Sequence, residues 1–252
     1  MKLNGITALV TGAASGLGAA TASALVERGC RVLGLDLQGS IEGATPVAGV
    51  TLVAVDVTSE SDVAEALVTI DHADAPLRLV VNCAGIAPAQ RILSSKGSHP
   101  LDVFRRTVEV NLVGTFNVLN QSAAVIAEQT ADTHGQRGVI INTASVAAFE
   151  GQIGQIAYSA SKGGVVGMTV PAARDLARNG IRVNTIAPGI IDTPLLAKLG
   201  PEVAASLAAG VPFPHRLGRP DEYAQLVIMI AEHDYLNGET IRMDGALRMA
   251  PQ

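Results

Sequence analysis

The chain has 252 residues, of which 48% are hydrophobic, 16% are charged and 3% are aromatic, and its formal net charge is −5. This composition excludes a disordered protein, because it supplies enough apolar surface for a core on both faces of a sheet. No long run of Lys or Arg is present, so we expect no nucleic-acid partner. The two cysteines lie in or after apolar stretches and the five histidines lack ligand spacing, so we predict reduced thiols and no metal site.

Two stretches bear on the location of the protein. Asn111–Ala127 carries no charged residue but contains Asn, Gln, Ser and Thr, which indicates a buried helix and not a membrane span. The first residues, Met1-Lys-Leu-Asn-Gly5, lead straight into a predicted strand, without the basic and apolar regions of a secretory signal. We therefore expect a cytoplasmic protein.

The first predicted strand, Ile6–Thr11, is followed by a glycine-rich turn, Gly12-Ala-Ala-Ser-Gly16-Leu-Gly18, and by a predicted helix, Ala19–Arg28. This order is the context that a dinucleotide-binding fingerprint requires. The glycines allow a tight turn, and the free N–H groups of the helix N-terminus attract a pyrophosphate. The position of the turn after a strand favours a cofactor site over an ordinary turn.

Asp36 follows the second predicted strand, Cys30–Leu35. A carboxylate at this point accepts hydrogen bonds from the ribose hydroxyls of an adenosine and repels a 2′-phosphate. No Arg occupies positions 37–41, where it could pair with such a phosphate. The alternative is a turn Asp without a ligand, but the position of Asp36 favours NAD over NADP.

The rest of the chain continues to alternate between strands and helices. Further strands are predicted at Val50–Val55, Leu77–Val81, Gly138–Thr143, Ile181–Ala187 and Glu239–Met243, and helices at Thr58–Thr69, Asp102–Asn120, Ala157–Arg178 (interrupted at Pro171), Leu195–Ala209 and Glu222–Glu232 (capped by Asp221). Loops are predicted at Gly39–Gly49 and Ile86–Leu101. Seven strands alternating with helices predict one α/β domain over residues 1–252, a doubly wound parallel sheet of the Rossmann type with helices on both faces.

Tyr158 and Lys162 are four residues apart in a predicted helix, and Ser145 lies just after a predicted strand. Residues with this spacing project from one helix face, and an ammonium close to a phenol favours the phenolate. A Tyr in that state can exchange a proton with an alcohol or a carbonyl. The alternative is a surface helix that happens to carry Tyr and Lys.

Hydride transfer to a nicotinamide requires a held cofactor, a group that takes the substrate proton, and a group that stabilises the reacting oxygen. The turn with Asp36, the pair of Tyr158 with Lys162, and the hydroxyl of Ser145 meet these needs in that order. Asn111 lies in the middle of a predicted helix, where Asn is a mediocre helix former. Its plain explanation is a satisfied polar contact in the core.

These residues, in this order and spacing, resemble the short-chain dehydrogenases/reductases. The resemblance covers the whole chain and rests on the turn after Thr11, Asn82-Cys-Ala-Gly85, Asn111, Ser145, Tyr158-x-x-x-Lys162 and Pro188-Gly189. It implies that Tyr158 is the general acid/base and that Ser145 binds the substrate oxygen. It also implies that Lys162 binds the nicotinamide ribose and lowers the pKa of Tyr158, and that Asn111 holds a water in a proton relay.

Within this family, three segments resemble the group of type II 3-hydroxyacyl-CoA dehydrogenases (17β-hydroxysteroid dehydrogenases type 10): residues 135–151, 212–218 and 236–245. This likeness implies an NAD-dependent enzyme of fatty acid metabolism that interconverts 3-hydroxyacyl-CoA and 3-ketoacyl-CoA, with an acyl-CoA thioester as partner and a homotetrameric assembly. It places substrate loops at about residues 86–101 and 188–218. The short loop after Asp36 departs from the group.

The residues predicted to line the cofactor site are Gly12, Ser15, Gly16, Leu17, Gly18, Asp36, Leu37, Asp56, Val57, Asn82, Cys83, Ala84, Gly85, Tyr158, Lys162, Pro188, Gly189, Ile191 and Thr193. Three alternatives stay open at this point. The enzyme could oxidise hydroxysteroids or other secondary alcohols, it could prefer NADP, or the chain could be a non-catalytic NAD(H)-binding protein that acts through a partner.

Overall fold

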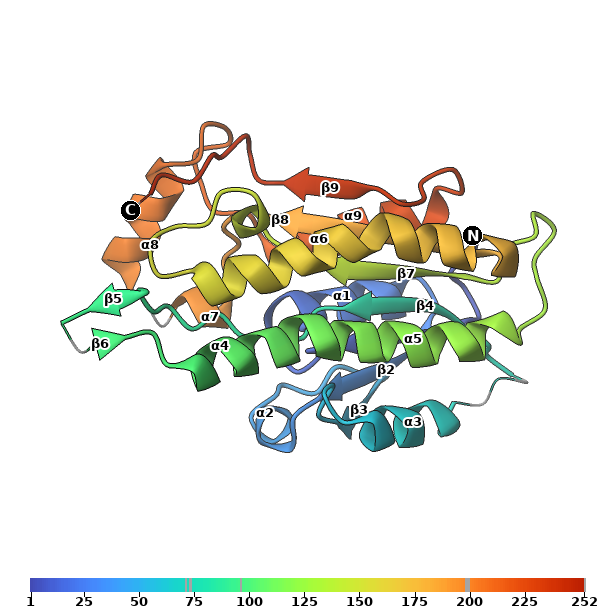
Figure 1. Cartoon of the computed structure of the whole chain (residues 1–252). Coiled ribbons are helices and arrows are strands. Elements are labelled where there is room, and N and C mark those ends of the chain that lie inside the picture. Colours follow the sequence, from blue (N-terminus) through green and yellow to red (C-terminus); the bar gives the residue numbers. More distant parts are fainter. Residues whose placement is uncertain (71, 73, 96, 198–199, 252) are drawn as a thin grey trace.

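The computed structural model describes residues 1–70, 72, 74–95, 97–197 and 200–251. In this part of the chain, seven parallel strands form one sheet in the order β3-β2-β1-β4-β7-β8-β9 (Figure 1). Their bounds are β1 Thr7–Thr11, β2 Arg31–Asp36, β3 Val50–Ala54, β4 Leu77–Asn82, β7 Gly138–Thr143, β8 Ile181–Pro188 and β9 Thr240–Met243. The predicted doubly wound parallel sheet is confirmed.

The strand order reverses between β1 and β4. The chain runs outward from β1 to β3, returns to β4 beside β1, and then runs outward in the other direction. Ligands of such sheets bind in the crevice outside the carboxyl ends of the strands at this switch point. The glycine-rich turn follows β1 and the segment 82–85 follows β4, so both predicted cofactor segments meet at the crevice.

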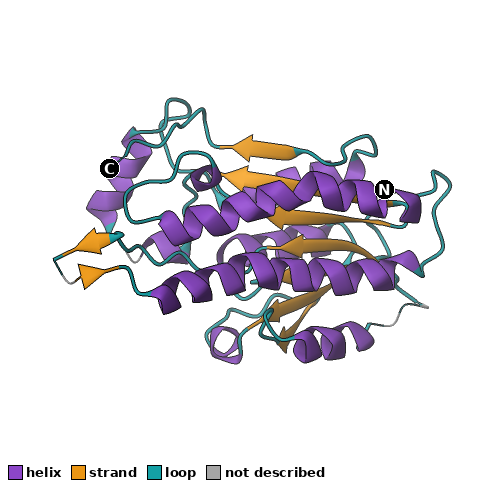
Figure 2. Cartoon of the chain, viewed as in Figure 1, coloured by secondary structure: helices purple, strands orange, loops and turns teal. Residues whose placement is uncertain are grey.

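Helices cover both faces of the sheet (Figure 2). On one face, α1 (Gly16–Glu27) and α9 (Pro220–Glu232) pack on a core that includes Ala8 and Val10. On the other face, α3 (Glu60–Val68), α5 (Gly114–Ala127) and α6 (Ile156–Leu176) pack on a core that includes Leu9. Successive strand residues point to opposite faces, so a strand that is covered on both sides is apolar throughout.

Two predicted loops contain regular structure. Gly39–Gly49 was expected to be irregular, but a short helix, α2, spans Gln38–Glu42. It buries no residue, so no apolar pattern marks it in the sequence. The loop 86–101 contains a small antiparallel hairpin of β5 (Leu93–Ser94) and β6 (Gly97–Ser98). All four described residues of these strands are exposed, so they too lack a pattern.

The predicted helix Asp102–Asn120 is three consecutive segments. α4 (Leu101–Val108) passes into a π-helical turn, Glu109–Val113, and then into α5. In this turn the N–H of Gly114 donates to the carbonyl of Glu109, which accommodates one more residue than an α-turn. Gly114 is required at this point, because a Cβ there would lie 2.7 Å from Cγ2 of Val57. The helix continues to Ala127, beyond the predicted end.

Three further helix predictions need correction. Leu195–Ala209 is divided into α7 (Pro194–Ala197) and α8 (Pro201–Ala209), because Pro201 favours a new helix start; residues 198–199 of the predicted helix lie outside the described part. α9 is capped at Arg219 and not at Asp221, since Pro220 takes the first helical position. Pro171 does not interrupt α6, which is continuous through it.

In the described part of the chain, no helix has the length and apolar content that a membrane crossing requires.

Candidate active site

The glycine-rich turn has the shape of a phosphate cradle. Gly12 and Gly16 adopt positive φ values of 66° and 53°, which L-residues with a side chain rarely adopt. At Gly18, a Cβ would overlap the carbonyl oxygen of Gly12, so only glycine lets α1 approach the turn this closely. The Ser15 side chain makes no capping hydrogen bond, which leaves the first N–H groups of α1 available to an anion.

Asp36 lies at the end of β2 beside this turn. Its Oδ2 accepts a hydrogen bond from the N–H of Ala14 at 3.0 Å, and its Oδ1 accepts one from the N–H of Leu37 at 2.8 Å. The two amides fix the carboxylate against the turn. Each oxygen keeps a further lone pair, which can accept a hydrogen bond from a ribose hydroxyl.

Thr11 joins the turn to the segment after β4. Its Oγ1 accepts hydrogen bonds from the N–H groups of Cys83 and Ala84, both at 3.0 Å. Sequence reasoning named Thr11 only as part of the motif and assigned it no role, although a hydroxyl residue at the end of the first strand is a usable signal. The side chain of Asn82 bonds to the neighbouring strand β7, because its Nδ2 donates to Oδ1 of Asn142 at 2.9 Å.

Ser145 and Tyr158 meet at the carboxyl end of β7. Ser145 caps a short 3-10 turn, Val146–Ala148, and its Oγ accepts from the N–H of Ala147 at 3.1 Å. Burial raises the pKa of the Tyr158 hydroxyl, and a hydrogen bond with the Ser145 side chain opposes that rise. The phenol is therefore protonated at neutral pH in this state.

Lys162 is almost fully buried, with 4% of its surface exposed. Its Nζ lies 5.8 Å from the centre of the Tyr158 ring and donates a 2.7 Å hydrogen bond to the carbonyl of Thr143. Burial lowers the pKa of Lys162 to about 8. The prediction that Lys162 lowers the pKa of Tyr158 is not confirmed, because loss of solvent raises the pKa of the phenol and the ammonium is directed at Thr143.

Asn111 lies in the π-helical turn and is fully buried. Its Oδ1 accepts from the N–H of Ile86 and its Nδ2 donates to the carbonyl of Ile86, both at 2.8 Å. Nδ2 also donates to Oγ of Ser161 at 3.0 Å. The side chain therefore makes a satisfied polar contact that ties the start of the loop 86–101 to α6. A satisfied polar contact in the core is one of the two explanations that the sequence left open for this Asn. Its role in holding a relay water stays a prediction.

Asp56 and Val57 follow β3 at the far side of the crevice. Oδ1 of Asp56 accepts from the N–H and the hydroxyl of Thr58, at 3.0 and 2.7 Å. These bonds lower the pKa of Asp56, and Arg106 on α4, 3.6 Å away, lowers it further. Val57 is buried against Gly114.

The segment after β8 folds over the glycine-rich turn. The N–H of Gly189 donates to the carbonyl of Met243 at 2.9 Å, and Ile191 pairs with Gly218 in a parallel bridge. A Cβ added at Gly16 would lie 3.6 Å from Cγ2 of Thr193, which places Thr193 at the mouth of the cradle. The other expected substrate loop, residues 86–101, is tied to the segment that joins Ser145 to Tyr158, since the N–H of Gln90 donates to the carbonyl of Gly154 at 2.7 Å.

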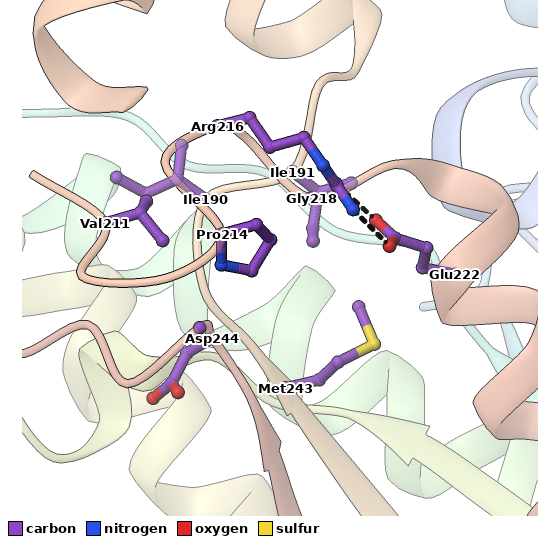
Figure 3. A pocket seen from close by; sticks show the side chains of 10 residues that line it. Ile190, Ile191, Val211, Pro214, Arg216, Gly218, Glu222, Met243 and Asp244 are labelled. Atoms are coloured by element: carbon purple, nitrogen blue, oxygen red, sulfur yellow. Dashed lines mark hydrogen bonds and ion pairs between the residues drawn. The ribbon is translucent and has the colours of Figure 1, made fainter. Parts of the chain in front are cut away.

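A cavity of about 130 Å³ lies beside the segment after β8 (Figure 3). Its lining includes Ile190, Ile191 and Met243 and, at one side, an ion pair of Arg216 with Glu222 at 2.7 Å. None of the predicted catalytic residues lines it. Most of its lining lies in the predicted substrate loop 188–218, but the sequence did not predict the cavity, because Glu222 on α9 and residues 243–245 join that loop only in the fold.

A cradle for a pyrophosphate, a carboxylate placed for a ribose, and a Ser–Tyr pair at the same sheet edge are the parts of a nucleotide-dependent oxidoreductase. The chain belongs to the short chain dehydrogenase family, whose model matches residues 6–204. It is therefore an oxidoreductase of this family, as the sequence predicted.

Known proteins are similar to this chain over nearly its whole length. The 3-hydroxyacyl-CoA dehydrogenase type-2 of Bos taurus is 54% identical over 256 residues, covering 99% of this chain and 98% of the relative. The protein of the same name from Drosophila melanogaster is 54% identical over 248 residues, covering 96% of this chain and 97% of the relative. The crystal structure of 3-hydroxyacyl-CoA dehydrogenase type-2 from Mycobacterium avium is 40% identical, covers 100% of both chains and has a TM-score of 0.90.

Proposed function

We propose that this protein is an NAD-dependent dehydrogenase that interconverts 3-hydroxyacyl-CoA and 3-ketoacyl-CoA. The observation that carries the proposal is the pair of Ser145 and Tyr158 at the same sheet edge as the glycine-rich turn, with Asp36 at the end of β2. The substrate class rests on the names of relatives that are 54% identical to this chain over 96% or more of its length.

The residues fit a dinucleotide. The tight turn Gly12–Gly18 depends on its glycines, because a Cβ at Gly12 or Gly18 would press on neighbouring backbone. The carboxylate of Asp36 is fixed by two amides and keeps further lone pairs. A carboxylate near the ribose repels a 2′-phosphate, so we propose NAD and not NADP. The nicotinamide supplies the acceptor of the substrate hydride.

The remaining steps belong to side chains of this protein. Ser145 donates a hydrogen bond to the substrate oxygen and stabilises negative charge on it. In the direction of reduction, the raised pKa of Tyr158 keeps its hydroxyl protonated and ready to donate to that oxygen. In the direction of oxidation, Tyr158 must first give up its own proton, and Lys162, whose pKa burial lowers to about 8, is a group that can accept it as the pH approaches 8. The Tyr158 phenolate then takes the hydroxyl proton of the substrate.

Tyr158→Phe tests the assignment in purified protein with a short 3-hydroxyacyl-CoA and NAD. Loss of a general acid/base costs about 10²–10⁴ in rate, so we expect kcat to fall by this factor while NADH still binds. Tyr235→Phe is the matched control, because Tyr235 is 96% exposed. Full turnover by the Tyr158 variant would show that another group carries the proton.

Hydroxysteroids and other secondary alcohols are the alternative substrates. A comparison of kcat/KM across 3-hydroxyacyl-CoA thioesters, hydroxysteroids and simple secondary alcohols separates the two proposals. We expect the thioesters to give the highest value. NADH binding without turnover on any of these substrates would favour the non-catalytic alternative.

We also propose a homotetramer, located in the cytoplasm. Apolar side chains on neighbouring α5 and α6 support an assembly, because Phe116 and Ile156 are 53% and 43% exposed. Sedimentation equilibrium of the purified protein checks the number of subunits, and cell fractionation checks the location. A monomer at micromolar concentration would contradict the first proposal.

A further inference from the structure

A fully buried tyrosine contacts the same strand residue, Thr143, as the catalytic lysine. Tyr223 on α9 is fully buried, and its hydroxyl lies 2.7 Å from Oγ1 of Thr143. A Tyr hydroxyl that is removed from water needs a hydrogen-bond partner, whereas an aliphatic or Phe side chain at the same helix position would need none. The catalytic roles assigned above make no use of this group.

The hydrogen bonds around Tyr223 have one consistent direction. The hydroxyl of Thr143 donates to the carbonyl of Asn82 at 2.6 Å, so it can only accept from Tyr223. The hydroxyl of Tyr223 therefore donates to Thr143, and its oxygen accepts from the thiol of Cys83 at 3.7 Å. This chain of bonds joins the ends of β4 and β7 to α9, and each of its hydroxyl and thiol hydrogens is used.

The same Thr143 holds the catalytic lysine. Its carbonyl accepts the 2.7 Å hydrogen bond from Nζ of Lys162. Among the described residues, no carboxylate pairs with Lys162, so this carbonyl is a main source of stabilisation for the buried ammonium. The backbone of Thr143 must keep its orientation for that bond to form.

α9 presents Tyr223 in a fixed position, because both of its ends are held. At its start, Arg216 donates to both carboxylate oxygens of Glu222, at 2.8 and 2.7 Å. At its end, the buried Arg182 donates to the carbonyls of Ile230 and Ala231, both at 2.9 Å. A guanidinium at a helix C-terminus satisfies carbonyls that have no partner within the helix.

We propose that Tyr223 is a positioning residue: its hydroxyl fixes Thr143, and through the carbonyl of Thr143 it holds Nζ of Lys162 beside Tyr158. The role of Lys162 rests on the proposed function, whereas the contacts of Tyr223 do not. The titratable groups that face this network are Cys83 after β4 and Lys162 on α6.

Tyr223→Phe removes the hydroxyl and leaves the ring in place. One net hydrogen bond contributes about 1 kcal/mol, so we expect kcat/KM to fall by about 5-fold. We also expect the pKa of Lys162 to fall below its value of about 8, because its acceptor is less fixed. NMR titration of the free protein, labelled with ¹³C at lysine Cε, reads this pKa without cofactor or substrate. Tyr235→Phe is the control that should change neither quantity.

Thr143 supplies a second test that does not depend on the stability of the Tyr223 variant. Thr143→Val removes the hydroxyl at nearly constant shape and should lower both kcat/KM and the pKa of Lys162. Thr143→Ser keeps the hydroxyl and should leave both at their wild-type values. The double variant Thr143→Val with Tyr223→Phe should be no worse than either single variant, because all three break the same link.

The results separate this inference from the proposed function. An unchanged pKa of Lys162 in Tyr223→Phe and in Thr143→Val overturns the inference, even if activity falls, because the effect would then be general destabilisation. A lowered pKa supports it, whether or not the protein oxidises a 3-hydroxyacyl-CoA. Absence of that oxidation in the wild-type protein refutes only the proposed substrate.

Discussion

The carboxylate of Asp36 accepts a 3.0 Å hydrogen bond from the backbone of Ala14, inside the glycine-rich turn. In the proposed function this group has two tasks, because it fixes the glycine-rich turn and would present a negative charge to an adenosine ribose. The proposed choice of cofactor and the shape of the turn are then coupled through this bond.

Asp36→Asn separates the two tasks, since the amide oxygen can still accept from Ala14 but carries no charge. We expect the preference for NADH over NADPH to fall by at least about 10-fold, which corresponds to roughly 1.4 kcal/mol. Asp36→Ala should relax the preference as well, and should weaken binding of both cofactors because the turn loses its anchor. Dissociation constants from NADH and NADPH fluorescence check this, and an unchanged ratio in both variants would refute the role of Asp36.

Gly18→Ala tests the close packing of α1 on the turn. The added Cβ overlaps the carbonyl oxygen of Gly12, so we expect a loss of about 1–3 kcal/mol in the free energy of unfolding and weaker NADH binding. Gly167→Ala is the matched control in α6, because a Cβ there meets no atom within 4 Å. Ala is the better helix former, so this control should gain up to about 1 kcal/mol. Equal effects of the two substitutions in urea unfolding would show that the contact with Gly12 is unimportant.

The buried ammonium of Lys162 makes stability depend on pH. Its pKa is about 8 in the folded protein and 10.5 in the unfolded chain, so the unfolded state binds more protons between these values. The contribution of Lys162 to the free energy of unfolding therefore rises with pH from about 8 to 10.5, and at neutral pH the group costs about 3 kcal/mol.

Lys162→Met removes this cost together with the proton relay. We expect the variant to be inactive and, at pH 7, more stable than the wild-type protein by up to about 3 kcal/mol. The difference between the two should shrink as the pH rises from about 8 to 10.5. Burial also raises the pKa values of Cys83 and Tyr158, which reduces the stability of both proteins at high pH. The difference in the free energy of unfolding between variant and wild type at each pH isolates the contribution of Lys162. Parallel pH profiles in chemical unfolding would contradict the prediction.

Asn111→Ala tests the polar contact in the π-helical turn. The substitution leaves the N–H and the carbonyl of Ile86 without their partner, and each unsatisfied buried group costs about 1–3 kcal/mol. We expect a loss of about 3 kcal/mol in the free energy of unfolding, measured in urea. Asn120→Ala is the control, because Asn120 is exposed on α5 and should change stability by less than about 0.5 kcal/mol. A loss in Asn111→Ala no larger than in this control would show that the contact is dispensable.

The sequence alone predicted seven strands in one parallel sheet and the positions of Gly12–Gly18, Asp36, Ser145, Tyr158 and Lys162 along the chain. These features rest on short patterns: apolar runs that end in a polar residue, glycines after a strand, and a spacing of four residues on a helix. Such patterns can be read from the sequence because residues that are close in the chain are also close in space. The sequence did not predict α2 or the hairpin of β5 and β6, because these exposed elements bury no apolar residue and so carry no such pattern.

The tertiary structure alone decided the surroundings of those residues. Tyr223 and Thr143 are 80 positions apart, and no pattern in the sequence connects them before α9 packs on the sheet. Burial likewise shifts both pKa values, since it lowers the pKa of Lys162 and raises that of Tyr158, whereas their spacing predicted a lowered pKa for Tyr158. Contacts between distant segments and the loss of solvent arise only on folding. The sequence therefore indicates which side chains react, and the fold sets their pKa values and their hydrogen-bond partners.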